Sequence, residues 1–298
     1  MLIYGFVKGG DSMAMPEVLQ VSCVQLHWAK TLERNLAQTL SYIRQAAEAG
    51  SRVVCFPEAT LTSYYFPYVI TLPRERVREA LGEVQRAAAE ANIWVIVGTI
   101  QATADRLLNL AHVINPQGRI THEYAKVHMA GADERKYCRP GNKISFFEID
   151  SVPCTLVICR DGRHPELYRI PAMAGAKILF QPSCSSDSLE AVHWKRVSGR
   201  AQQPAGPNSS IYHCVANTVG QSPDGEQTSS GQSYIRDPTG LPLAEAGYYE
   251  EGIITAILKL SHATGSYARD SFEHPAFLRP YWEQMITEMR RRADETPE

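Results

Sequence analysis

Several features that would assign the protein to a class are missing from its sequence. No apolar run approaches the ~20 residues that a helix needs to cross a bilayer. There is no C-x-x-C pair and no H-E-x-x-H, so the usual zinc spacings are absent. There is also no G-x-S-x-G turn of the kind that carries a serine nucleophile. These absences argue against a membrane-spanning protein, a common zinc site and a serine hydrolase.

A large excess of positive or negative charge is also missing. The 298 residues include 30 Lys and Arg against 32 Asp and Glu, a formal net charge of −2. Such a balance gives no electrostatic reason to expect nucleic acid or an anionic membrane as a partner. Residues 1–16 have one lysine and a brief apolar patch, too short for a secretory signal. We expect a loose N-terminal extension, with initiation at Met13 or Met15 also open.

The seven cysteines are an odd number and are scattered singly, which does not suit a disulfide framework. Most lie in apolar runs, where cysteine behaves as a small hydrophobic residue. This usage predicts a reducing, cytoplasmic location. The cysteines are Cys23, Cys55, Cys138, Cys154, Cys159, Cys184 and Cys214.

Short strands rich in Val and Ile recur along the chain, bounded by Gly, Pro, Asn or Asp. Apolar residues at helical spacing predict helices between the early strands and at the C-terminal end. Turn sequences at residues 115–118 and 237–240 predict antiparallel hairpins. The predicted strands are 18–24, 52–56, 93–99, 108–114, 118–124, 144–149, 154–158, 176–180, 211–216, 231–236 and 252–258. The first predicted helix begins at residue 32 and ends before Gly50. The others are 73–91, 165–174, 188–203 and 275–292.

Many strands with few helices favour an α/β architecture of two stacked mixed sheets with outer helices. There is no internal repeat, low-complexity stretch, charge block or strong linker composition, so we expect one domain over residues 1–298. The tail 293–298 is expected to fray, and the loops 202–210 and 220–230 to be the most flexible surface segments.

Three chemically distinct residues each follow a short apolar run: Glu58, Lys126 and Cys159. A thiol, a carboxylate and an ammonium at strand ends are what acyl transfer by a cysteine nucleophile requires. The thiol needs a base or a nearby cation to react at neutral pH, and the oxyanion that develops needs fixed positive charge or N–H donors. Glu134, eight positions after Lys126, adds a second acid.

Each of these residues also has an ordinary structural interpretation. Cys159 could be a buried core cysteine, Glu58 and Glu134 surface acids, and Lys126 a solvated lysine at a strand end. The sequence after Cys159 favours catalysis, because Pro165-Glu166 resembles the first turn of a helix, whose N–H groups would lower a thiol pKa. His122 and His128 flank Lys126, but their spacing matches no metal motif, so they are predicted to be structural.

Taken in order, the four residues and their surroundings resemble the nitrilase, or carbon–nitrogen hydrolase, superfamily. The resemblance extends from about residue 18 to residue 260. Its pieces are Phe56-Pro57-Glu58, Tyr124-Ala125-Lys126, Glu134 with Pro140-Gly141, Cys-x-Asp-Gly-x-x-Pro-Glu from Cys159, Gln181-Pro182-Ser183, Ala216 to Gly220 and Gly231 to Gly240. Ala125 departs from the arginine that is usual before the family's lysine.

The resemblance implies an α-β-β-α sandwich, no metal or organic cofactor, and the following catalytic roles. Glu58 would be the general base and acid, and Cys159 the nucleophile that forms a thioester. Lys126 and the N–H of Arg160 would stabilise the oxyanion, and Glu134 would hold Lys126 and orient the substrate. Relatives pair through helices, which predicts a homodimer or higher homo-oligomer.

The expected substrate is a small linear amide or an N-carbamoyl compound, with a nitrile as the nearest alternative. Arg163 matches an arginine that grips a substrate carboxylate in carbamoyl-amino-acid hydrolases, and a guanidinium suits that role. It could equally be structural, and Arg160 could point to the pocket or to solvent. Tyr64 could line the pocket or pack against a subunit. A non-catalytic binding or scaffold protein on the same fold is the alternative of another class, against which the intact triad argues.

Overall fold

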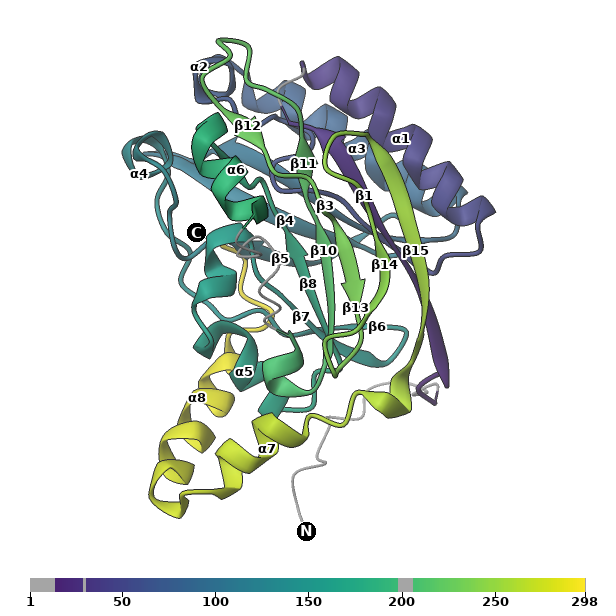
Figure 1. Ribbon diagram of the computed structural model, residues 1–298, viewed down its shortest axis with the longest axis vertical. Coiled ribbons are helices and arrows are strands. Elements are labelled where there is room, and N and C mark those ends of the chain that lie inside the picture. Colours follow the sequence, from purple (N-terminus) through teal and green to yellow (C-terminus); the bar gives the residue numbers. More distant parts are fainter. Residues whose placement is uncertain (1–13, 29–30, 198–205, 298) are drawn as a thin grey trace.

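The computed structural model describes residues 14–28, 31–197 and 206–297. Two mixed β-sheets lie face to face, with helices on their outer surfaces (Figure 1). The α-β-β-α sandwich expected from the sequence is therefore confirmed. Most of the N-terminal extension, part of the loop 202–210 and the C-terminal part of the helix predicted at 188–203 lie outside the described residues.

The first sheet has seven strands, with both parallel and antiparallel pairs. Its strand order is β11-β1-β2-β3-β4-β5, and β15 pairs with the edge of β1 opposite to β2. β2 runs parallel to β1 and β3, whereas β4 is antiparallel to both β3 and β5. The strands are β1 (Val18–His27), β2 (Val53–Cys55), β3 (Trp94–Ala102), β4 (Leu107–Ile114), β5 (Ile120–Ala125), β11 (Thr218–Val219) and β15 (Gly252–Lys259).

The second sheet has six strands in the order β14-β13-β10-β8-β7-β6. β7, β8 and β10 are parallel neighbours, and the outer pairs are antiparallel. The strands are β6 (Phe147–Ile149), β7 (Val152–Leu156), β8 (Ile178–Pro182), β10 (Tyr212–Ala216), β13 (Tyr234–Arg236) and β14 (Pro242–Glu245). A small separate ladder joins β9 (Ser186–Asp187) to β12 (Thr228–Ser229).

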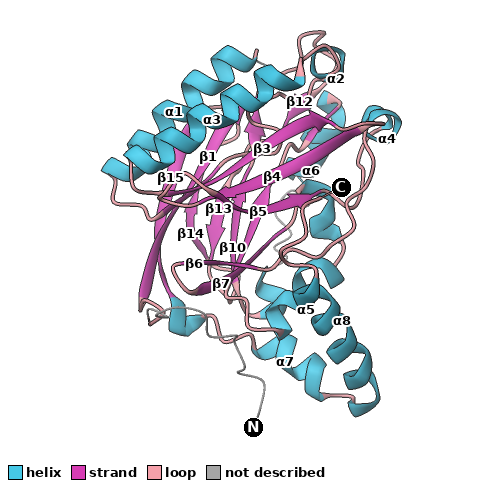
Figure 2. Ribbon diagram, turned by 180° about the vertical axis from the view of Figure 1, so that it is seen from behind, coloured by secondary structure: helices cyan, strands magenta, loops and turns pink. Residues whose placement is uncertain are grey.

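Alternation along the strands explains the layers. On β1, Val21 and Cys23 face the second sheet, whereas Val24 and Leu26 face the helices α1 (Leu32–Glu48) and α3 (Arg74–Glu90). Successive side chains of a strand point to opposite faces, so a strand buried on both sides is apolar along most of its length. α1 and α3 cover the outer face of the first sheet (Figure 2).

The outer face of the second sheet is covered by α5 (Glu166–Met173), α7 (Ser266–Glu273) and α8 (Arg279–Arg291). Leu179 of β8 packs against these helices, whereas Ile178 and Phe180 of the same strand fill the space between the sheets. The remaining helices are short or lie near the sheet edges. They are α2 (Phe66–Val69), α4 (Ala132–Tyr137) and α6 (Leu189–Val197).

The hairpins predicted at 115–118 and 237–240 are present as β4–β5 and β13–β14. The strand predicted at 144–149 is shorter, since only Phe147–Ile149 pairs. The expectation of a flexible loop at 220–230 is wrong in part. β12 lies within it, and Thr228, Ser229 and Ser230 are buried because they pair with β9 and bond to β11. None of the described helices combines the length and apolar character that a membrane span requires.

Candidate active site

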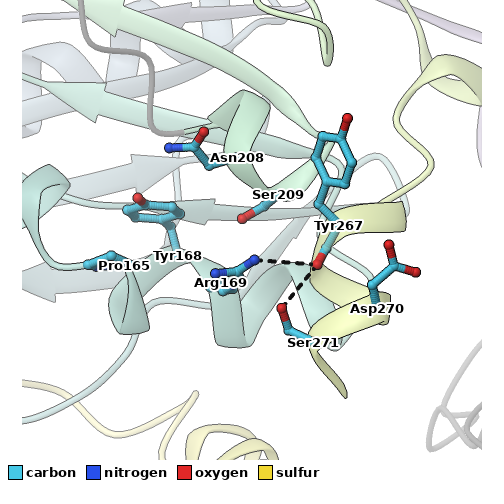
Figure 3. A pocket seen from close by; sticks show the side chains of 8 residues that line it. All are labelled: Pro165, Tyr168, Arg169, Asn208, Ser209, Tyr267, Asp270 and Ser271. Carbon is cyan, nitrogen blue, oxygen red and sulfur yellow. Dashed lines mark hydrogen bonds between the residues drawn. The ribbon is translucent and has the colours of Figure 1, made fainter. Parts of the chain in front are cut away.

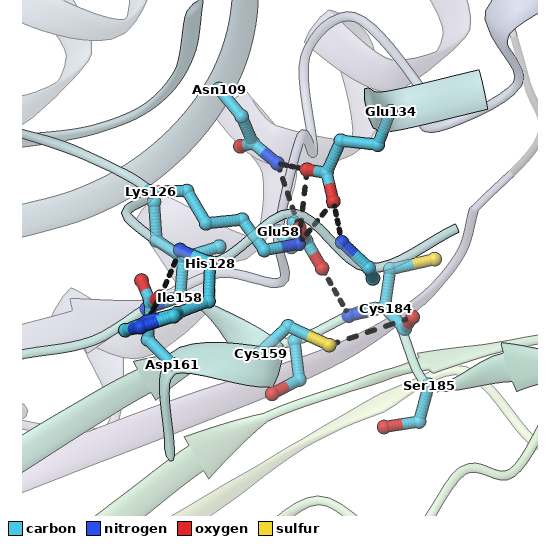
Figure 4. Close-up of polar contacts among 12 residues, drawn as sticks. Glu58, Asn109, Lys126, His128, Glu134, Ile158, Cys159, Asp161, Cys184 and Ser185 are labelled. Atoms are coloured by element: carbon cyan, nitrogen blue, oxygen red, sulfur yellow. Dashed lines mark hydrogen bonds and ion pairs between the residues drawn. The ribbon is translucent and has the colours of Figure 1, made fainter. Parts of the chain in front are cut away.

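The ends of three strands and one short helix bring the predicted acids, lysine and cysteine to one place. Glu58 lies three residues after β2, Lys126 directly follows β5, and Glu134 lies on α4. Cys159 lies three residues after β7 and begins a 3-10 helix, Cys159–Arg163. Glu58 and Lys126 thus come from the first sheet, Glu134 from α4 and the sulfur from the second sheet, and Figure 4 shows the side chains together.

Lys126 is fully enclosed and paired with both carboxylates. Its Nζ lies 2.6 Å from Oε1 of Glu58, and 3.0 and 2.9 Å from the two oxygens of Glu134. All three residues are at most 2 % exposed. A buried charge is tolerated only when it is paired and hydrogen-bonded, and removing one member of such a set typically costs ~3–5 kcal/mol. The structure therefore contradicts the interpretation of these residues as solvated surface groups.

Asn109 of β4 connects the two acids, and the sequence analysis did not single it out. Its Nδ2 donates to Oε1 of Glu58 and to Oε1 of Glu134, both at 2.7 Å. The backbone N–H of Lys126 bonds to the carbonyl of Asn109 at 2.9 Å, which ties the lysine to the same strand. Only pairing of β4 with β5 places the amide there. Its one sequence signal was a polar residue in a buried apolar strand.

The backbone of Cys184 lies between the carboxylate and the thiol. Its N–H donates to Oε2 of Glu58 at 2.9 Å, and its carbonyl lies 3.8 Å from Sγ of Cys159 (Figure 4). This residue follows β8, two positions after the strand ends. The two peptide groups that flank the Cys184 Cα thus hold the acid and contact the sulfur, so one residue positions both.

Burial and charge set the protonation of the cluster. Burial raises the pKa of Glu58, and the pull of Lys126 in the other direction only partly offsets it. Burial, followed by the charge of Glu58, raises the pKa of Cys159 to about 12. Burial would lower the pKa of Lys126, but Glu58 and its other negative neighbours outweigh this, and the net shift is upward. At neutral pH the resting site therefore holds an ammonium and a protonated thiol.

Cys159 has a left-handed backbone conformation, with φ of 46°. For a residue other than glycine such a conformation costs on the order of 1–3 kcal/mol and is tolerated only where the surroundings impose it. The helix start predicted at Pro165-Glu166 is confirmed, since α5 begins at Glu166. The expectation that its N–H groups would lower the thiol pKa is wrong, because the 3-10 helix separates Cys159 from α5 and burial raises that pKa.

Asp161, within that 3-10 helix, fastens the cysteine segment to the lysine segment. Its buried carboxylate accepts from the N–H groups of Val127 (3.3 Å), His128 (2.7 Å) and Ile158 (3.4 Å) and from the hydroxyl of Tyr124 (2.9 Å). The two segments come from different sheets. An acceptor-only carboxylate with several N–H partners is well suited to holding them in register.

The three residues proposed from the sequence for substrate binding differ in their surroundings. Tyr64 faces the cluster: Nζ of Lys126 lies 5.5 Å from its ring centre, and burial together with the negative charges of Glu58 and Glu134 raises its pKa. Arg160 is half-buried and Arg163 is exposed, both on the 3-10 helix. Among the described residues, neither arginine forms an ion pair with a protein carboxylate, although Arg163 acts on Asp187 through its charge.

One group could in principle hold a metal ion: His128, His164 and Glu166 have ligand atoms within 4.8 Å of one another. The two imidazole rings stack face to face, with centroids 3.4 Å apart and planes inclined by 3°. Ring nitrogen lone pairs lie in the ring plane, so those of two stacked parallel rings do not converge on one ion. His128 also bonds Asp161 through Nδ1 at 3.0 Å. The donor set does not fit a metal centre.

Two surface pockets lie away from this cluster. One of about 440 Å³ is lined by residues of α5, of α7 and of the 3-10 helix Gly206–Ser209, among them Tyr168, Arg169 and Asp270 (Figure 3). Arg169 donates there to the carbonyl of Tyr267 at 3.4 Å. Cys159, Glu58 and Lys126 are not among the residues that line it.

Comparison with known proteins gives a consistent result. Residues 20–267 match the carbon–nitrogen hydrolase family. The omega-amidase NIT2 of Homo sapiens is 29% identical over 254 residues, covering 81% of this chain and 88% of that protein. The 2-oxoglutaramate amidase of Bacillus subtilis is 29% identical over 248 residues, covering 82% and 92%. The crystal structure of an amidase from Nesterenkonia sp. superposes with a TM-score of 0.73 at 22% identity, covering 92% of this chain and 99% of that one.

Proposed function

This chain belongs to the carbon–nitrogen hydrolase family, and we propose that it hydrolyses a small linear amide with Cys159 as nucleophile and Glu58, Lys126 and Glu134 as its partners. The family and its amidase relatives make it an enzyme that acts on C–N bonds other than peptide bonds. The observation that supports the residue assignment best is the backbone of Cys184, whose N–H donates to Oε2 of Glu58 and whose carbonyl lies 3.8 Å from the sulfur of Cys159.

The first step is proton transfer from the thiol to Glu58 as the sulfur attacks the amide carbon. A thiol with a pKa of about 12 does not ionise at rest, so the proton must leave during the attack. Among the described residues Oε2 of Glu58 has one hydrogen-bond donor, the N–H of Cys184, whereas Oε1 accepts from both Lys126 and Asn109. Oε2 is therefore the oxygen that can accept the thiol proton.

Collapse of the tetrahedral intermediate breaks the C–N bond and leaves a thioester. Glu58 returns its proton to the departing nitrogen, so ammonia or an amine leaves neutral. A water molecule then gives a proton to Glu58 and its oxygen attacks the thioester carbon. The C–S bond breaks, the acid is released, and the sulfur recovers the proton from Glu58. One carboxylate thus serves both half-reactions.

An oxyanion forms once in each half-reaction, and it needs hydrogen-bond donors or positive charge directed at it. Lys126 supplies the fixed positive charge, and the N–H of Arg160 supplies the second donor. Removing a single oxyanion donor typically costs ~3–4 kcal/mol of barrier height. Glu134 and Asn109 hold Lys126 in place, and Glu134 also accepts the N–H of Ala130.

We further propose that the substrate carries a carboxylate as well as the amide. Relatives are described as omega-amidases and a 2-oxoglutaramate amidase, whose substrate is an acid. Arg160 and Arg163 lie close to the nucleophile in sequence and are free of ion pairs among the described residues. A guanidinium can bind a carboxylate with two parallel hydrogen bonds. Tyr64, which faces the cluster, would contact the same substrate.

Seven free cysteines, six of them buried, support a reducing cytoplasm as the working location. A homodimer or larger homo-oligomer, a single catalytic domain over residues 1–298 and independence from cofactors belong to the same proposal.

The test is a panel of ω-amides of small acids, simple aliphatic amides, N-carbamoyl amino acids and nitriles, scored by ammonia release. We expect amides of small acids to be hydrolysed fastest. Cys159→Ala should abolish turnover while the circular dichroism spectrum stays native. Iodoacetamide should label Cys159 before any other cysteine. Turnover that survives Cys159→Ala, or fast labelling elsewhere with Cys159 inert, would contradict the assignment. A preference for nitriles would favour the alternative of a nitrilase.

A further inference from the structure

A hydrogen-bonded network of two buried side chains and one half-buried side chain lies on the second sheet, next to Cys159. Nε2 of Gln181 on β8 donates to the backbone carbonyl of Cys159 at 3.1 Å. Oε1 of the same amide lies 2.9 Å from Nε2 of His213 on β10, and Nδ1 of that ring lies 3.2 Å from the hydroxyl of Tyr234 on β13. The three side chains come from neighbouring strands, so the sheet itself spaces them.

The donors and acceptors of this network have one consistent direction. The amide oxygen of Gln181 can only accept, so Nε2 of His213 must carry a proton. In a neutral imidazole Nδ1 is then the acceptor, and it takes the hydroxyl proton of Tyr234. Burial, helped by the charge of Arg236, lowers the pKa of His213 to about 3, so the ring stays neutral throughout the pH range of an assay. Every hydrogen bond therefore points from Tyr234 toward Cys159.

The end point of this direction is the peptide between Cys159 and Arg160. In a trans peptide the C=O and the N–H point in opposite directions from one rigid plane. A donor that holds the carbonyl of Cys159 therefore also fixes where the N–H of Arg160 points. In the part of the chain that the structure describes, no acceptor is found for that N–H. Hydrogen bonds in series also polarise one another, which strengthens the last donor.

Gly162 supplies the space that this arrangement needs. A Cβ at this position would lie 2.7 Å from both Nε2 and Oε1 of Gln181. A side chain at position 162 would therefore push the Gln181 amide away from its partners Cys159 and His213, so the glycine in the Cys-x-Asp-Gly sequence keeps this network intact.

We propose that Tyr234, His213 and Gln181 are positioning residues, which orient and polarise the Arg160 N–H as an oxyanion donor. The inference rests on the proposed amide hydrolysis at Cys159. It assigns a function to three residues that contact neither the substrate nor the Glu58–Lys126–Glu134 cluster. It also explains how the left-handed backbone at Cys159 is held.

The test compares two reactions of the same sulfur. Amide hydrolysis passes through an oxyanion, whereas alkylation by iodoacetamide is a displacement at an sp³ carbon and forms none. A defect in the oxyanion donor should slow only the first. Gln181→Leu should lower kcat for the best amide by roughly 10- to 100-fold, somewhat less than loss of a whole oxyanion donor. The alkylation rate of Cys159 should stay within about twofold, since it does not depend on the donor.

A matched pair at His213 separates hydrogen bonding from packing. Glutamine can replace the ring with one donor and one acceptor, whereas leucine has neither. We expect His213→Gln to keep most of the amide turnover and His213→Leu to lose it to an extent similar to Gln181→Leu. Tyr234→Phe removes a single hydroxyl and keeps the ring, so it serves if the leucine variants do not fold. A several-fold loss in kcat with KM unchanged is expected for it.

His122→Leu is the control. His122 is also a buried histidine whose pKa burial lowers to about 3, but it bonds Ser145 and lies outside the network. It should leave both reactions unchanged within about twofold, as expected for a residue without a role in the oxyanion donor. Equal slowing of hydrolysis and alkylation in the network variants would overturn the inference, as would full amide turnover in Gln181→Leu. A wild-type protein that hydrolyses no amide would instead contradict the proposed function.

Discussion

Replacement of Glu134 by glutamine tests the electrostatics of the cluster most directly. The two oxygens of Glu134 accept from Lys126, Asn109 and the N–H of Ala130. A glutamine amide has the same shape but no charge, and one of its ends carries donors. Whichever way it turns, an NH₂ group must face at least one of these donors. The substitution therefore removes a negative charge and adds one unfavourable contact.

The size of the charge effect can be worked out from the geometry. Oε1 of Glu58 and Oε1 of Glu134 each lie 2.7 Å from Nδ2 of Asn109, so they are no more than about 5.4 Å apart. Two unit charges at ~5 Å interact by about 3 kcal/mol at an effective dielectric constant of ~20, equivalent to about two pKa units. Lys126 between them screens part of this, so about one unit is expected.

The sign follows from the role of Glu134, whose charge raises the pKa of Glu58 and that of Cys159. In Glu134→Gln both pKa values should fall. The base is active when ionised, so the acidic limb of kcat/KM should move about one pH unit lower. The cysteine should become thiolate more readily, and its alkylation at neutral pH should accelerate several-fold.

Amide turnover should change in the opposite direction. The NH₂ group of the new glutamine faces the ammonium of Lys126 or the N–H of Ala130, which are also donors. Such an unsatisfied buried contact costs about 1–3 kcal/mol, which corresponds to a roughly 10- to 100-fold loss in kcat. The assay is ammonia release over pH 4–9 alongside timed iodoacetamide labelling, with Glu283→Gln, on the exposed face of α8, as a matched control. An acidic limb that stays in place or moves upward would refute the electrostatic argument. So would alkylation that slows together with turnover, which indicates general damage.

Three further predictions follow from the described contacts. Lys126→Met leaves two buried carboxylates without their cation, so the free energy of unfolding measured by urea titration should fall by about 3–5 kcal/mol and turnover should be lost. Unchanged stability would contradict the buried pairing. Arg163→Leu should raise KM for amides of acids far more than for neutral amides, and equal effects would remove its carboxylate role. Burial lowers the pKa of both His122 and His213 to about 3 in the folded protein, so only the unfolded chain binds protons there between pH 6.5 and 3. As the pH falls through this range, the free energy of unfolding should decrease by up to about 1.4 kcal/mol per pH unit for each histidine. His213→Gln should reduce this slope.

Much of the fold could be predicted because its information is local. Apolar runs bounded by turn residues marked most strands, and the spacing of Leu32, Leu36, Leu40 and Ile43 marked α1. The shortest elements escaped prediction. β9, β11 and β12 are two-residue strands of polar or mixed composition that form only because a neighbouring segment pairs with them. The pattern of strand ends carrying Glu58, Lys126 and Cys159 likewise came from local sequence.

The amino-acid sequence by itself determined the order of the strands and predicted which residues at their ends carry the proposed chemistry. Only the tertiary structure decided how those residues are held. Asn109 bridges two acids, Asp161 joins two segments, and Gln181 holds the peptide after the nucleophile. Each of these contacts joins segments 22 to 51 positions apart. No local pattern encodes such pairs, because they exist only once strands distant in sequence have come together within each sheet and, for Asp161, once the two sheets have stacked.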